Sequence, residues 1–78
     1  MTTETLTLDG DYIELCTLLK IAGPTVSGGM AKHLIADGLV FVDDVIETRK
    51  KCKIKAGQTV IFDEFEIKVL APNTSNPN

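Results

Sequence analysis

Apolar residues recur near the start of the chain at the spacing of a helix. From Ile13 onward they stand three and four positions apart, as far as Ala22, which places most of them on one helical face. Asp11 is of a type that caps helix N-termini, and Gly23 followed by Pro24 is typical of a helix end. The pattern predicts a first helix over about 11–22.

A second helix is predicted to follow at once. Ser27 is a favourable N-cap, apolar residues from Met30 to Ile35 form one stripe, and Gly38 stands where helices commonly end. Gly28 and Gly29 leave the first-turn N–H groups sterically open. Ser27 therefore fits two roles, an ordinary cap or part of an anion site at the positive end of the helix.

Beyond Gly38 the period of the apolar residues changes to two, which is typical of strands. Strands are predicted over 39–42, 45–48, 59–62 and 65–70, with tight turns at 43–44 and 63–64. Before the helices only 6–8 alternates, which predicts a short leading strand. The order indicates an α+β fold in which two N-terminal helices pack on a small antiparallel sheet. We expect one domain over 1–71 and a disordered tail, without apolar residues, over 72–78.

Length and composition narrow the class of protein. A chain of 78 residues with 44% hydrophobic and 5% aromatic residues predicts one small domain with an aliphatic core. The start lacks the pattern of a signal peptide, and no apolar run approaches a membrane span, so we expect a cytoplasmic protein. The spacing of Cys16 and Cys52 suggests no metal site, and we expect two reduced thiols and no cofactor. Cys16 belongs to the apolar face of the first helix. Cys52 fits either an inward strand position or, between two lysines, an exposed thiolate.

Charge is separated along the chain. The net charge is −3, which argues against a protein that coats nucleic acid through bulk charge. Five of the eight basic residues nevertheless lie between Arg49 and Lys55, and no acid occurs from Thr48 to Gln58. By itself this run is as typical of a solvated loop as of a binding surface.

The order of motifs resembles the S4 RNA-binding domain, and most of all the small stand-alone bacterial S4-like proteins of the YbcJ type. The helical half is similar at Leu18-Leu19-Lys20, Gly23 and Ser27-x-x-x-Ala31-Lys32-x-Leu34-Ile35-x-x-Gly38. The other half is similar at Val40-x-Val42-Asp43, Thr48-Arg49 and Lys53-Ile54-Lys55-x-Gly57. The resemblance covers about 13–62 without a gap. The chain departs from the family pattern at Gly28, where a basic residue is common, and at Asp44, where glycine is usual.

The resemblance implies an αL motif, two helices packed on a small sheet, that binds structured RNA, often ribosomal. Carried over to this chain, the RNA-binding surface comprises Lys20, Ser27, Lys32, Arg49, Lys50, Lys51, Lys53 and Lys55. We therefore expect a non-enzymatic, monomeric RNA-binding module without a catalytic or metal site, in which His33 is an ordinary helix-surface residue. The alternative, favoured by the net acidity, is a protein-interaction or regulatory adaptor that keeps the fold with little RNA affinity.

Overall fold

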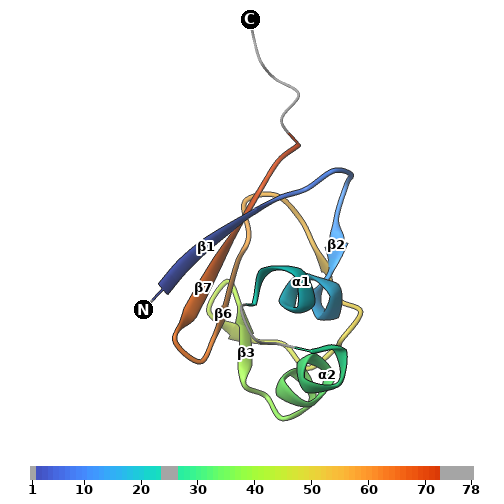
Figure 1. Ribbon diagram of the computed structural model, residues 1–78, viewed down its shortest axis with the longest axis vertical. Helices are drawn as coiled ribbons and strands as arrows, with labels where there is room; N and C mark the ends of the chain where they lie inside the picture. The colour runs from blue at the N-terminus through green and yellow to red at the C-terminus, as the bar shows by residue number, and fades with distance from the viewer. Residues whose placement is uncertain (1, 24–26, 73–78) are drawn as a thin grey trace, which may run out of the picture.

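The computed structural model describes residues 2–23 and 27–72, which form two helices and two sheets (Figure 1). In Figure 1 the helices lie beside each other on one side of the long ribbon made by β1, β7 and β6. In chain order the elements are β1 (Thr2–Thr7), β2 (Ile13–Glu14), α1 (Leu15–Ala22), α2 (Gly28–Ala36), β3 (Val40–Val42), β4 (Val45–Ile46), β5 (Lys53–Ile54), β6 (Thr59–Phe62) and β7 (Phe65–Leu70).

The larger sheet has the order β1-β7-β6-β3-β4. Neighbouring strands are antiparallel except β1 and β7, which pair in parallel from Thr2 opposite Phe65 to Thr7 opposite Leu70. The predicted antiparallel sheet was therefore wrong at this pair. The placement of the helices at the N-terminus is not confirmed, because β2 precedes them in addition to the leading strand. The leading strand extends over six residues because threonine is a good strand former and β7 supplies its hydrogen bonds.

The core is aliphatic, as the composition predicted. Alternate residues of the central strands point to one face of the sheet, where Val40 and Val42, then Val60 and Phe62, are buried. The apolar face of α1 packs on this surface, and no buried side chain among the described residues is polar. The fully buried side chains of largest volume are Leu15, Leu18, Leu19, Ile35, Ile54, Ile67, Val40, Val60 and Val69.

Helix α1 begins later than its apolar pattern predicted. Asp11 does not cap it, because Ile13 and Glu14 are extended and pair with Ile54 and Lys53 of β5. Glu14 occupies the N-cap position without a side-chain hydrogen bond to the helix. The helix ends at Ala22, as predicted.

Helix α2 begins and ends where the local sequence signals predicted. Ser27 caps it, since its Oγ accepts a hydrogen bond from the Met30 N–H at 3.2 Å. At the other end the N–H of Gly38 bonds to the Ile35 carbonyl and that of Leu39 to the Leu34 carbonyl. This pair of bonds is a Schellman motif, and it requires the positive φ of 76° that Gly38 adopts.

The β3–β4 turn consists of Asp43 and Asp44, with φ of 52° and 70°. Two successive left-handed residues are typical of a type I′ hairpin, in which glycine is the favoured second residue. The Asp43 carboxylate stabilises the turn by accepting hydrogen bonds from the Thr59 N–H at 3.0 Å and the Gln58 side chain at 3.1 Å. The predicted tail over 72–78 lies outside the described residues, except for Pro72.

Candidate nucleic-acid interface

The segment from Arg49 to Lys55, called here the basic loop, lies over the start of α1. The Leu15 N–H donates to the Cys52 carbonyl and the Cys16 N–H to the Lys50 carbonyl, both at 2.9 Å. The first N–H groups of a helix have no partner within the helix. In α1, then, carbonyls of the basic loop take the place of a side-chain cap, and the same two bonds hold the loop in position.

Both lysines at the tip of the basic loop have exposed side chains. Lys50 and Lys51 form the middle of a turn that the Cys52 N–H closes onto the Arg49 carbonyl at 3.1 Å. Neither lysine takes part in an ion pair within the described residues. The tip of the loop therefore presents two ammonium groups to solvent from a fixed backbone.

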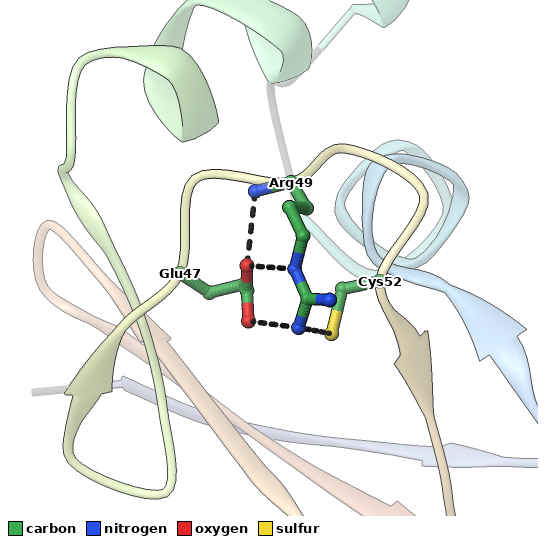
Figure 2. Close-up of polar contacts among 3 residues, drawn as sticks. All are labelled: Glu47, Arg49 and Cys52. Carbon is green, nitrogen blue, oxygen red and sulfur yellow. Dashed lines mark hydrogen bonds and ion pairs between the residues drawn. The ribbon is translucent and has the colours of Figure 1, made fainter.

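Arg49 differs from these lysines because it is paired with Glu47 (Figure 2). The Glu47 carboxylate accepts hydrogen bonds from Arg49 Nε at 2.9 Å, from Nη2 at 3.1 Å and from the Arg49 backbone N–H at 3.0 Å. These bonds lower the pKa of Glu47 to about 2. The Arg49 side chain nevertheless remains 76% exposed. Arg49 is thus held against its own loop and has fewer donors available for an outside ligand.

Cys52 completes this cluster and is not an activated thiol. Its Sγ lies 3.9 Å from Arg49 Nη2, and its side chain is partly buried against the core. Burial raises the pKa of the Cys52 thiol, and the neighbouring Glu47 raises it further. Of the two interpretations left open by the sequence, the structure supports an inward position, with Cys52 packed against the core just before β5, and does not support an exposed thiolate. Cys16 and Cys52 are both free thiols, as predicted.

The last two lysines of the basic loop, Lys53 and Lys55, each contact a neighbouring segment, Lys53 through its side chain and Lys55 through its backbone. Lys53 belongs to β5, and its Nζ lies 5.0 Å from the centre of the Tyr12 ring, at a distance that allows a cation–π contact. The Lys55 N–H donates to the Gln58 side chain at 2.7 Å, which ties this end of the loop to the Asp43 turn. Both lysine side chains remain exposed.

The other three predicted site residues, called here the second cluster, are Lys20, Ser27 and Lys32. Ser27 is the N-cap of α2, and Lys32 stands one turn after Gly28 on the same helix face. Lys20 is in the last turn of α1, and its Cδ lies 3.3 Å from the position that a Cβ on Gly28 would occupy. The absence of a side chain at Gly28 therefore makes room for the Lys20 stem against the first turn of α2. The Lys20 stem thus lies beside the position, 28, at which the resemblance to the S4 domain predicts a basic side chain.

The two clusters lie near opposite ends of helix α1. The basic loop covers its first turn, and Lys20 leaves from its last turn. At a rise of 1.5 Å per residue, its eight residues separate the two ends by about 12 Å. The structure thus places the basic loop beside the first turn of α1, and Lys20, next to Gly28 of α2, at its last turn. Sequence reasoning did not predict that Glu47 pairs with Arg49, because a local pattern does not show which charged side chains will meet.

Other kinds of site find no support in the described part of the chain. No group of three or more histidine, cysteine, aspartate or glutamate side chains is placed to hold a metal ion among these residues. His33 lies exposed on α2. None of the described helices is long and apolar enough to span a membrane.

Known proteins are similar to this chain over most of its length. The model of the S4 domain family matches residues 6–70. YbcJ of Escherichia coli (strain K12), a proposed RNA-binding protein, is 53% identical over 60 residues, which are 77% of this chain and 86% of that protein. RlbA of Bacillus subtilis (strain 168), a proposed ribosome maturation protein, is 33% identical over 60 residues, 77% of this chain and 84% of that protein.

A solved structure extends the similarity to the backbone. The solution structure of E. coli YbcJ, described as containing an αL motif involved in RNA binding, matches with a TM-score of 0.64 and 49% identity. The match covers 91% of this chain and 89% of that one. The matched residues, the identities and the shared arrangement of two helices on a mixed sheet all support the same assignment. The chain therefore belongs to the S4 domain family and is similar to the αL-motif protein YbcJ.

Proposed function

We propose that this chain is a non-enzymatic module that binds structured RNA, ribosomal RNA in particular, through the basic loop and the second cluster. The observation that carries the proposal is the fixed backbone beneath Lys50 and Lys51, whose exposed side chains have no ion-pair partner within the described residues. A cationic loop that is already ordered loses little entropy when it meets a phosphate backbone.

The geometry favours a folded RNA over a single strand. The two clusters are held by the backbone near opposite ends of α1, which suits a ligand that presents phosphates at fixed separations, as a helix or a folded junction does. Binding of single strands depends on aromatic platforms for the bases. The exposed aromatic side chains among the described residues are Tyr12, which faces Lys53, and Phe41, which lies on β3.

The names of the relatives support the same proposal. YbcJ is a proposed RNA-binding protein with an αL motif, and RlbA is a proposed ribosome maturation protein. Taken together they make ribosomal RNA the first ligand to test. We further propose that the chain acts in the cytoplasm as a monomer, with Ser27 and Lys32 contacting phosphate beside Lys20.

The test is an RNA titration at several salt concentrations with ribosomal RNA fragments. Replacement of Lys50 and Lys51 by alanine should weaken binding at least tenfold and lower the slope of log K against log salt by about 1.5, since each phosphate contact contributes roughly 0.7–0.9. Lys68→Glu is the matched control, because it changes the net charge by the same amount from β7, outside both clusters. Equal losses in both variants would mean that bulk charge, and not the basic loop, carries the binding.

The alternative function is that of a protein-interaction adaptor with little RNA affinity. The net charge of −3 favours it, because the chain as a whole repels RNA at long range. The same titration separates the two functions. Binding that is weak at low salt and unaffected by the Lys50/Lys51 change would support the adaptor.

A further inference from the structure

A groove of about 440 Å³ opens on the surface between α2, the start of β3 and the turn that joins β6 to β7. Figure 1 shows these elements at the same end of the molecule. Most of the residues that line it have apolar side chains. They are Met30, Leu34, Leu39, Phe41, Phe62 and Phe65.

The groove is formed by local structure and is not a gap left by loose packing. The Schellman motif at Gly38 brings Leu39 back beside Leu34 at the end of α2, which is the apolar contact typical of this motif. Phe62 and Phe65 flank the two-residue turn, with ring centres 5.5 Å apart. Side chains at the mouth remain open to water, because Leu39 is 51% and Met30 48% exposed.

The charged side chain that lines the groove is negative. Asp63 lines it, and no lysine or arginine does so among the described residues. Asp37 and Glu64, which directly adjoin lining residues in the chain, are exposed and form no ion pair in the described part of the molecule. Lys32 does not offset this negative charge. It follows Met30 by two residues, which corresponds to about 200° around α2, so the two residues lie on opposite faces of the helix.

We propose that this groove binds a protein segment that presents an apolar side chain next to lysine or arginine. The apolar lining would bury the side chain, and Asp63, with Asp37 and Glu64 nearby, would attract the adjacent cations. RNA is disfavoured here because its phosphates would meet these carboxylates. A second copy in a symmetric dimer is disfavoured because it would place its own Asp63 against this one. The chain would then hold RNA on its cationic clusters and a basic protein segment on this groove.

The test is a selection of random 12-residue peptides displayed on phage against the immobilised full chain, without RNA. We expect enriched peptides that combine leucine, phenylalanine or methionine with lysine or arginine. Synthetic copies of the best peptide should bind at least tenfold more weakly to Leu39→Ser and to Met30→Ser. Asp63→Asn should weaken binding about threefold at low salt and less at high salt, as expected for an exposed charge pair. Asparagine also tolerates the positive φ of 55° at this position.

The control is Val45→Ser, which removes an apolar side chain that is 67% exposed but does not line the groove. It should leave peptide affinity unchanged, and thermal melting should show that every variant is folded. Several results would overturn the proposal: no enriched peptide, acidic peptides, or equal binding to the wild type and the groove variants. A dimer seen by sedimentation and lost in Leu39→Ser would assign the groove to a second copy instead. Because no RNA is present, failure here leaves the proposed RNA-binding function intact.

Discussion

The pair formed by Glu47 and Arg49 allows a prediction in which stability and RNA affinity change in opposite directions. Glu47→Gln keeps the size of the side chain but removes the charge that holds the Arg49 guanidinium and backbone N–H. The protein should become less stable at neutral pH. Its affinity for RNA should rise by about threefold at low salt, because a negative charge beside the basic loop is removed and Arg49 is released.

The loss of stability can be bounded from the geometry. An exposed ion pair contributes about 0.2–1 kcal/mol, and a bidentate carboxylate–arginine pair lies near the upper end. The lowered pKa of Glu47 taken alone would indicate more, but water screens a partner whose side chain is 76% exposed. We therefore expect Glu47→Gln to lower the free energy of unfolding by about 1 kcal/mol.

The dependence of stability on pH gives an independent test of the stabilising effect of the Glu47 carboxylate. The pKa of Glu47 falls from 4.5 to about 2 on folding, so its carboxylate stabilises the native state above pH 4.5, and this contribution is lost as the pH falls through about 2. Urea unfolding at pH 7, 4 and 2 should show the difference between the wild type and Glu47→Gln shrinking as the pH falls.

The matched control is Glu4→Gln, which makes the same charge change on β1, away from the basic loop. It should alter RNA binding much less than Glu47→Gln does. A Glu47→Gln protein that binds RNA more weakly would refute the idea that Glu47 competes with phosphate for Arg49. It would indicate instead that the pair orders the loop for binding.

Three further predictions concern single positions. Ser27→Ala should lower the free energy of unfolding in urea by about 1 kcal/mol, because it removes the hydrogen bond that caps the Met30 N–H. If the folded variant also binds RNA more weakly, Ser27 contacts phosphate in addition to capping the helix. Asp44→Gly should raise stability by about 0.5–1 kcal/mol, since Asp44 has a φ of 70°, and an unchanged melting temperature would contradict the strain argument. Dithiothreitol should leave the melting temperature unaltered, because Cys16 and Cys52 are free; a large fall would reveal a bridge between them.

The sequence determined those elements whose signals are local. Helix α2 follows from the Ser27 cap, the apolar stripe and the left-handed Gly38, which all lie within a dozen residues. The antiparallel pairing of β3 with β4 and of β6 with β7 follows from period-two patterns joined by two-residue turns. The basic loop was predictable for the same reason, because its cations are adjacent in the chain.

Tertiary structure decided the features in which distant segments meet. The parallel partner of β1 is more than sixty residues away, so no local pattern could indicate its direction. The start of α1 depends on carbonyls of Lys50 and Cys52, and the nearer cap candidate Asp11 is unused because β2 pairs with β5.

The same division holds for the surfaces. The approach of Lys20 to Gly28 and the apolar groove beside Asp63 both combine side chains from separate elements. Hydrophobic periodicity and turn chemistry act over a few residues, and they specify which face of an element is buried. They do not specify what that face meets, which is settled only when burial of the whole core selects one arrangement of the chain.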